Sequence, residues 1–359
     1  MNALPRILVC ASQSPALDEV RRLLRANGHE AEGHLLGMPV PYDLERQSLV
    51  IVDGGPAPAA ALEAGADACL LRPFAPGELL AQVRAFMRIK EIHERLAEKT
   101  AEVHRVNRRL QQAYQQIDQE LQLARRLQSS FLPRTLPQVP GVRFAVHYAL
   151  SGRVGGDFYD AFRLDEGHVG FYVADAMGHG VPASLLTIFV KMGVRAKEVF
   201  GQQYRLVPPD EVLSRLNREL IGQELSESPF ITMVYGLFNH EEGVLHFARA
   251  GHPYPLYLPR DGDLQLWRQE GLLLGVVEGR FPARSHRLRP GDKVLFYSDG
   301  IDTARLEGQE PGTPSLLACA ARHRTLPAQE FVDRLALDLF DGSARPDDLT
   351  LLALELSDG

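Results

Sequence analysis

Residues 169–180 read Val-Gly-Phe-Tyr-Val-Ala-Asp-Ala-Met-Gly-His-Gly, a hydrophobic run that ends in a carboxylate and a glycine-rich turn. Short runs of β-branched and aromatic residues bounded by Gly are typical of strands, so residues 169–174 are predicted to form one, with Asp175 at its end. Three more acidic motifs have a similar setting: Gly155-Gly156-Asp157, Ser298-Asp299-Gly300 and Pro346-Asp347-Asp348.

Four carboxylates at strand ends can face one cleft, and several carboxylates together bind hard divalent cations through oxygen. Two bridged cations would turn a water into a nucleophile near neutral pH and neutralise phosphoryl oxygens. Any one of these Asp residues, taken alone, is more often a turn former or a helix cap. The repetition therefore favours a shared metal site.

The surrounding segment, residues 132–359, is predicted to be one α+β layered domain, because short strands and helices are grouped along it. The predicted strands are Val142–Tyr148, Val169–Ala174, Ile231–Phe238, Val244–Ala250, Lys293–Tyr297 and Leu349–Leu356. The predicted helices are Pro182–Phe200, Asp210–Leu225, Thr313–Arg322 and Ala328–Leu339.

A heptad repeat precedes this domain over residues 87–131, which contain neither Gly nor Pro. The pattern favours a two-stranded coiled coil between two copies of the chain, with charged breaks at Lys99 and Glu120. One long helix lying against a domain is the alternative. The seam positions are Ile89, Ile92, Leu96, Val103, Val106, Leu110, Ala113, Ile117, Ala124, Leu127 and Phe131.

Residues 1–86 read as a separate small α/β domain. Two runs without polar alternation, residues 6–10 and 49–52, are typical of strands buried in a parallel sheet. Between them, Pro15–Asn27 has apolar residues at helical spacing, and Gly28 follows as a stop signal.

Composition narrows the class of protein. The chain has 359 residues, 45% hydrophobic and 24% charged, with a net charge of -7, so it offers no basic field for nucleic acid. Its three cysteines, Cys10, Cys69 and Cys319, are widely spaced, which favours a reducing, cytoplasmic setting. No apolar run is long enough for a signal-peptide core or a membrane span, so no membrane partner is expected.

Across about residues 120–357 the sequence resembles the metal-dependent (PPM, type 2C-like) protein phosphatases, in the bacterial branch typified by SpoIIE and RsbU. The resemblance implies a four-layer αββα sandwich of two antiparallel sheets between helical layers, with metals at the sheet edge. It rests on ordered motifs at residues 123–133, 154–160, 175–185, 232–236, 250–253, 291–300 and 347–352.

The resemblance also implies roles for single residues. Asp175 would bridge two Mn²⁺ or Mg²⁺ ions, with Asp157 and the Ala176 carbonyl on one ion and Asp299 and Asp347 on the other. Asp348 would support the ligands without binding metal.

Four further residues receive a role or a choice of roles. His179 would orient water or protonate the leaving oxygen, or else only fix the turn between Gly178 and Gly180. Arg153 is either a phosphate contact or a solvated surface residue. Asp160 and His252 match motif positions and are interpreted as structural.

Residues 5–86 resemble a response-regulator receiver, which implies a flavodoxin-like topology with Asp53 in the phosphoacceptor position. Arg72-Pro73-Phe74 stands where that family has Lys-Pro-Phe. The family's acidic pair is replaced by Cys10-Ala11-Ser12, and only about ten residues separate Asp53 from the turn at 64–67. A magnesium ion would have few ligands, so the domain is expected to dock or pair without phosphorylation.

Two functions remain after these observations. The first is a phosphoserine/phosphothreonine phosphatase whose substrate, by family resemblance, is a phosphorylated STAS-type anti-sigma-factor antagonist. The second is a non-catalytic dimeric scaffold that sequesters a signalling partner. The complete set of Asp157, Asp175, Asp299 and Asp347 favours the enzyme, because a scaffold has no use for every ligand.

Overall fold

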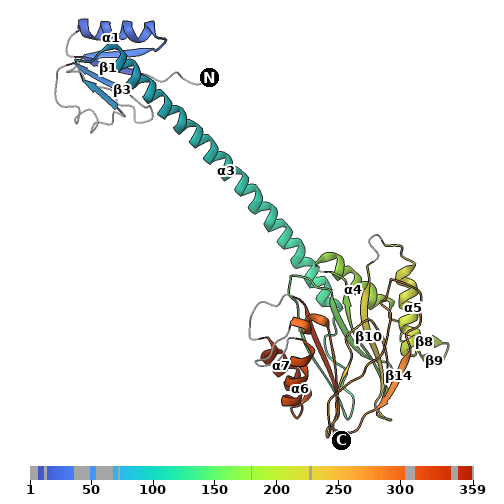
Figure 1. Cartoon of the computed structure of the whole chain (residues 1–359). Coiled ribbons are helices and arrows are strands. Elements are labelled where there is room, and N and C mark those ends of the chain that lie inside the picture. Colours follow the sequence, from blue (N-terminus) through green and yellow to red (C-terminus); the bar gives the residue numbers. More distant parts are fainter. Residues whose placement is uncertain are drawn as a thin grey trace. The chain divides into compact units, whose positions relative to one another are not determined.

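The computed structural model describes residues 7–11, 14–35, 49–53, 68–71, 73–178, 180–225, 229–303, 312–340 and 347–357. The chain divides into two compact units, Met1–Tyr114 and Gln115–Gly359, which are described separately (Figure 1). No helix in the described ranges combines the length and the apolar character needed to cross a membrane.

The first unit contains a parallel sheet in the order β2-β1-β3-β4. Its strands are β1 (Ile7–Ala11), β2 (Ala31–Leu35), β3 (Leu49–Asp53) and β4 (Ala68–Leu71), and helix α1 (Ser14–Ala26) follows β1. The order matches the first four strands of a flavodoxin-like sheet. The two predicted strands and the helix are confirmed, and Asp53 ends β3; the receiver assignment itself stays a prediction.

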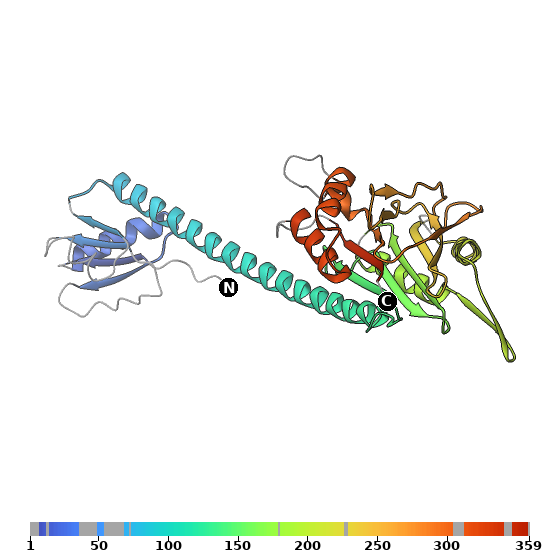
Figure 2. The same cartoon turned by 90° about the horizontal axis from the view of Figure 1, so that it is seen from below.

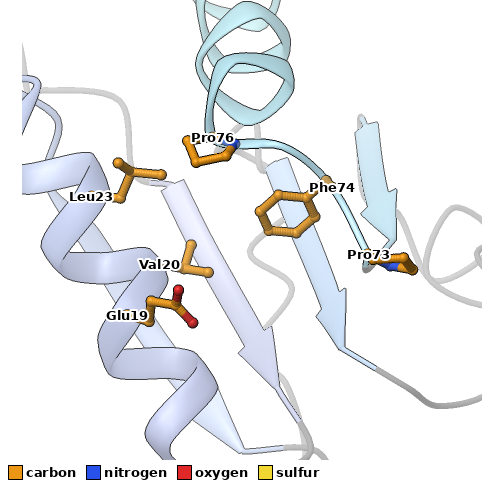
Figure 3. Close-up of a pocket in the computed structure, with 6 residues that line it drawn as sticks. All are labelled: Glu19, Val20, Leu23, Pro73, Phe74 and Pro76. Carbon is orange, nitrogen blue, oxygen red and sulfur yellow. The ribbon is translucent and has the colours of Figure 1, made fainter.

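Helix α1 packs on this sheet through Leu17, Val20 and Leu24, which join a core with Ile7 and Val9. A notch of about 220 Å³ lies between α1 and the segment that leads from β4 into the next helix. Figure 3 shows Phe74 facing Val20 and Leu23 across it. Arg72 and the turn at 64–67 lie outside the described residues.

Helix α3 (Pro76–Phe131) begins at a proline, which is favourable in a first helical turn, and contains the whole predicted heptad segment. The start of α3 belongs to the first core through Leu79, Val83 and Phe86. The large apolar seam side chains from Ile89 to Leu127 are each more than half exposed. The coiled coil remains a prediction, and these exposed side chains are the surface it requires.

The second unit is a sandwich of two five-stranded antiparallel sheets, with orders β14-β11-β10-β7-β6 and β13-β12-β15-β16-β5 (Figures 1 and 2). The first sheet consists of β6 (Asp157–Arg163), β7 (His168–Ala176), β10 (Ile231–Asn239), β11 (Val244–Ala250) and β14 (Ala283–Arg287). The second consists of β5 (Val142–Ala149), β12 (Leu256–Leu258), β13 (Gln265–Leu266), β15 (Lys293–Tyr297) and β16 (Leu349–Leu356).

Three apolar cores build the layers. One fills the space between the sheets and includes Phe171 and Phe296, whose ring centroids are 4.9 Å apart. A second lies between the first sheet and helices α4 (Val181–Gly193) and α5 (Pro209–Ile221). A third lies between the other sheet and helices α6 (Thr313–His323) and α7 (Ala328–Leu339). The predicted αββα sandwich is therefore confirmed.

One predicted element is partly wrong. The helix predicted over Pro182–Phe200 ends at Gly193, and Lys197–Phe200 forms strand β8, which pairs with β9 (Gln203–Leu206). Gly201, with a φ of 64°, closes this hairpin in a conformation that favours glycine. The β-branched and aromatic pair Val199–Phe200 suits a strand better than a helix.

Candidate metal centre

Two of the four acidic residues face each other across neighbouring strands. Asp157 is the first residue of β6, and it lies directly opposite Asp175 on β7. Residues directly opposite in an antiparallel pair project from the same face, and like charges in this arrangement repel. The sequence thus places two carboxylates where only a cation or a proton removes their repulsion.

Asp157 is oriented by hydroxyl groups from the opposite sheet. Ser298 Oγ and Thr350 Oγ1 each donate to Asp157 Oδ2 at 2.6 Å, and the Thr350 amide donates to Ser298 Oγ at 3.0 Å. Asp157 is 1% exposed. Burial raises its pKa to about 8, although the two hydroxyl hydrogen bonds act in the opposite direction.

Asp175 is in a similar electrostatic position, but no hydroxyl group among the described residues donates a hydrogen bond to it. Burial raises its pKa to about 9, and the charges of Asp157, Asp299 and Asp347 add to the effect. The pKa of Asp299, at the start of the 3-10 helix η1 (Asp299–Thr303), is raised by partial loss of hydration and by Asp347. These mutual effects show that the four carboxylates share one region at the end of the sandwich.

In the described chain no Lys or Arg forms an ion pair with any of the four. Carboxylates that repel one another and have no cationic partner among the described residues fit divalent metal ions, because oxygen ligands of this type are the ones that Mg²⁺ and Mn²⁺ take. The donor set is therefore suited to the ions that the sequence analysis expects.

Two glycines shape the backbone around the carboxylates. A Cβ on Gly156 would lie 2.5 Å from the Ala176 carbonyl oxygen and 3.1 Å from Asp175 Oδ1. A Cβ on Gly155 would lie 1.9 Å from Asp348 Oδ2. The 2.5 Å contact is with a backbone atom, which cannot move aside as a side chain can, so the close approach at position 156 requires glycine. It also leaves the Ala176 carbonyl in a cradle that any side chain at 156 would fill.

Asp348 anchors the loop that leads into β6. Its Oδ1 accepts from the Ser151 amide at 2.8 Å and from Ser151 Oγ at 3.0 Å, and its Oδ2 accepts from the Gly156 amide at 2.8 Å. The neighbouring Asp347 is exposed, and its Oδ1 accepts from the Asp348 amide at 2.8 Å. Asp348 therefore holds the backbone of the loop, whereas the carboxylate of Asp347 remains accessible to solvent.

A residue without an expected role, Gln128 near the end of α3, contacts the same loop. Its Nε2 donates to the Gly155 carbonyl at 2.8 Å and to Thr187 Oγ1 at 3.2 Å, while its Oε1 accepts from the Gly155 amide at 3.3 Å. Gln128 is 2% exposed, whereas the nearby Gln122 on the same helix is exposed. In the sequence, the one feature that pointed to Gln128 was its position within the motif at residues 123–133.

The remaining candidates have different settings. His179 lies outside the described residues. Arg153 pairs with Asp118 of α3 at 2.9 Å, with both side chains about half exposed. Asp160 is buried and pairs with Lys191 of α4, and His252 is buried with its Nδ1 2.8 Å from Thr232 Oγ1.

Residues 165–357, more than half of the chain, match the family model described as Stage II sporulation protein E (SpoIIE). The chain belongs to the SpoIIE family. This confirms the resemblance drawn from the motifs of the second unit.

Known relatives of this SpoIIE-family chain agree with the fold. It is 29% identical over 245 residues to the phosphoserine phosphatase RsbU of Bacillus subtilis (strain 168). The alignment covers 67% of this chain and 71% of that protein. The solved RsbU and RsbW domains of Rv1364c from Mycobacterium tuberculosis align with a TM-score of 0.52 at 28% identity, over 64% of each chain. The SiaA-PP2C domain of Pseudomonas aeruginosa aligns with a TM-score of 0.56 at 22% identity, over 68% of this chain and 98% of that one.

Proposed function

We propose that the second unit is a protein phosphatase that hydrolyses phosphoserine and phosphothreonine with two Mn²⁺ or Mg²⁺ ions. The observation that carries the proposal is the group of four carboxylates at one end of the sandwich, with raised pKa values at Asp157, Asp175 and Asp299 and no cationic partner in the described chain. The similarity to a phosphoserine phosphatase supports the same reaction.

In this proposal Asp157, Asp175 and the Ala176 carbonyl would hold one ion, and Asp175, Asp299 and Asp347 would hold the other. When bound, the ions supply acidification of water and neutralisation of phosphoryl oxygens. Ser298 and Thr350 keep the Asp157 carboxylate in one orientation.

The reaction itself is a direct displacement. The water oxygen bonds to phosphorus, the ester P–O bond breaks, and the departing serine or threonine oxygen takes a proton, so no covalent enzyme intermediate forms. We assign the delivery of that proton to His179, since an imidazole titrates near neutral pH.

The substrate that we propose is a phosphorylated STAS-domain antagonist of an anti-sigma factor in a partner-switching pathway. The family membership and the similarity to RsbU support this assignment. The three widely spaced cysteines favour a cytoplasmic setting for such a pathway.

We assign regulation of the phosphatase activity to the first unit and to α3. In this scheme two copies of the chain form a homodimer through a coiled coil of their α3 helices. The exposed seam from Ile89 to Leu127 supports pairing, and the hydrogen bonds of Gln128 to Gly155 connect the end of the same helix with the metal loop. We place no phosphorylation at Asp53 in this scheme.

A substrate comparison tests the proposal. The full chain with Mn²⁺ is incubated with a phosphorylated STAS-domain protein and with an unrelated phosphoserine peptide. We expect phosphate release from both, with kcat/KM at least about tenfold higher for the STAS protein, because the surfaces around the site add binding energy. Tight binding of the phosphoprotein without phosphate release would instead establish the scaffold.

A further inference from the structure

A second group of potential metal ligands lies on α6 and α7, the pair of helices that covers the second sheet (Figure 1). Cys319 and His323 are four residues apart on α6 and therefore on one face of that helix, while Asp338 comes from α7. Sγ of Cys319, Nε2 of His323 and an oxygen of Asp338 all lie within 4.8 Å of one another. None of the three takes part in the candidate metal centre.

Asp338 Oδ2 is the common point of this group. His323 Nε2 lies 2.7 Å from it and Cys319 Sγ lies 3.9 Å from it. Cys319 is fully buried, whereas the side chains of His323 and Asp338 are 17% and 28% exposed. An ion can therefore enter from the solvent side and still reach a thiol that is shielded from other reagents.

The spacing is close to that of a metal site. For bonds of about 2.0–2.3 Å to N, O and S, tetrahedral coordination places neighbouring ligand atoms about 3.3–3.6 Å apart. The carboxylate and imidazole, now 2.7 Å apart, have to separate by about 0.6 Å or more, and the thiol has to move closer to both. Rotation of the three side chains about their torsions is expected to supply these shifts.

We propose that Cys319, His323 and Asp338 form a binding site for one transition-metal ion of the Zn²⁺ type, with water as the fourth ligand. A set of one thiolate, one imidazole and one carboxylate suits Zn²⁺ and Co²⁺, while Mg²⁺ and Mn²⁺ prefer oxygen. The site therefore differs in selectivity from the all-oxygen centre formed by the four Asp residues.

Binding of an ion would replace contacts that these side chains make with one another. The thiol of Cys319 is buried and faces Asp338 Oδ2 at 3.9 Å, so an ion that binds here takes the place of the thiol proton. Coordination then forms the metal–sulfur bond and releases that proton to solvent. Arg322, with a side chain 57% exposed and 3.3 Å from Asp338, is free to turn outward when the ion takes over its charge pairing.

A bound ion would connect the last turn of α6 to the last turn of α7. The two helices pack on each other, and α7 packs on β5 and β16, so the link would stabilise one outer layer of the sandwich. The proposal concerns stability and metal content, and it stands or falls independently of the phosphatase reaction.

Cobalt absorption tests the site on the full chain. Metal-free protein is titrated with Co²⁺ in excess Mg²⁺, and a near-ultraviolet thiolate-to-cobalt charge-transfer band is expected to saturate at one equivalent. The all-oxygen centre has no sulfur and gives no such band. Zn²⁺ should then displace Co²⁺ and abolish the band, because the filled d shell of Zn²⁺ accepts no electron from the thiolate in this spectral range.

Single variants assign the band. Cys319→Ser is expected to remove it, while the matched variants Cys10→Ser and Cys69→Ser keep it. Asp338→Asn and His323→Gln, which preserve shape and fold, should each raise the Co²⁺ dissociation constant at least about tenfold, since loss of even an outer-shell partner has that effect.

Thermal unfolding provides the second readout. Zn²⁺ should raise the melting temperature of the wild-type chain and leave that of Cys319→Ser unchanged. Absence of the band in wild-type protein, or its persistence in Cys319→Ser, would overturn the proposal and leave the three side chains as a hydrogen-bonded group only.

Discussion

At the scale of single residues, the four carboxylates at the end of the sandwich have no Lys or Arg partner in the part of the chain that the structure describes. Asp157 and Asp175 have pKa values raised to about 8 and 9, so without metal they are largely protonated near neutral pH. Groups that a fold uses for stability usually have partners that favour their charged form. Binding of metal cations would supply the positive charge that these carboxylates lack, and this accounts for the arrangement.

Asp348 is a residue whose loss should be felt in stability. In Asp348→Ala, the amides of Ser151 and Gly156 lose a charged acceptor, and we expect the free energy of unfolding to fall by about 3 kcal/mol. Urea unfolding measures the change, with the exposed Asp261→Ala as the matched control. A loss no larger than that of the control would show that Asp348 does not hold the loop.

His252 gives a prediction for the pH dependence of stability. Burial, with a contribution from Arg249, lowers its pKa to about 3, while the unfolded chain protonates it near 6.5; Thr232 faces its Nδ1. Between these values the unfolded state binds more protons, so this histidine removes up to about 1.4 kcal/mol of stability per pH unit as the pH falls. Above pH 6.5 this histidine causes no loss of stability, and the loss begins as the pH falls below that value.

The corresponding variant is His252→Asn, which can still bond to Thr232 and does not titrate. The free energy of unfolding, measured by urea at several pH values from 7 to 4, should fall less steeply than in the wild type, because all other titrating groups are shared. Parallel curves for the two proteins would contradict the assignment.

The sequence was sufficient to select the acidic residues, because strand ends and glycine-rich turns are local patterns. It was not sufficient for their partners: Ser298 and Thr350 reach Asp157 across 141 and 193 residues, and Asp348 reaches Ser151 across 197. Such contacts depend on how the two sheets are stacked. Local periodicity contains no information about that stacking.

At the scale of elements, the end of α3 is the most informative. Most of this helix is exposed, but Gln128 is buried between the Gly155 loop and Thr187 of α4. Two elements that shape the candidate centre therefore meet one side chain of the long helix. The heptad pattern predicted the helix and gave no reason to separate Gln128 from its neighbours.

A pair of variants on α3 tests this contact. Gln128→Ala leaves the Gly155 amide and carbonyl without their side-chain partner, so we expect a loss of about 1–3 kcal/mol in stability and a several-fold increase in the Mn²⁺ concentration needed for half-maximal activity. Gln122→Ala, an exposed change on the same helix, is the control. Equal behaviour of the two variants would contradict a connection between the helix and the metal loop.

Element boundaries show where local patterns fail. The strands with clear apolar runs, β10, β11, β15 and β16, were predicted within one residue of their ends. Strand β6 was missed because its sequence, Asp-Phe-Tyr-Asp-Ala-Phe-Arg, alternates poorly. Strand β8 was taken as the end of α4, since no Pro separates the two segments.

At the scale of the whole molecule, the exposed seam of α3 is a large apolar surface. Single exposed apolar residues are ordinary, but a stripe with heptad spacing is typical of a helix that pairs with another helix. Leu96, Val103 and Leu110 are 61%, 56% and 51% exposed. A second copy of the chain offers the same stripe.

Leu110→Asp should convert a dimer into a monomer, because it places a carboxylate in the centre of the seam. Light scattering gives the mass in solution, and phosphate release measured on the same samples shows whether pairing sets the rate. Gln112→Asp introduces the same charge outside the seam and should leave the dimer intact. A variant that remains dimeric would exclude the seam as the interface, and a monomer with unchanged turnover would exclude it as the regulator.

The central claim is that the four carboxylates form a divalent-metal centre that hydrolyses phosphoserine. The most direct measurement is phosphate release from a phosphoserine peptide as a function of Mn²⁺ concentration, for the wild type and for Asp175→Asn. The variant should fold normally, because Asn matches the protonated carboxyl that the raised pKa of Asp175 implies for the metal-free protein. We expect Mn²⁺-dependent release by the wild type and a loss of at least about 100-fold in the variant, since the proposed bridge between the ions is gone. Equal turnover by Asp175→Asn, or undiminished turnover of the wild type in excess chelator, would contradict the account.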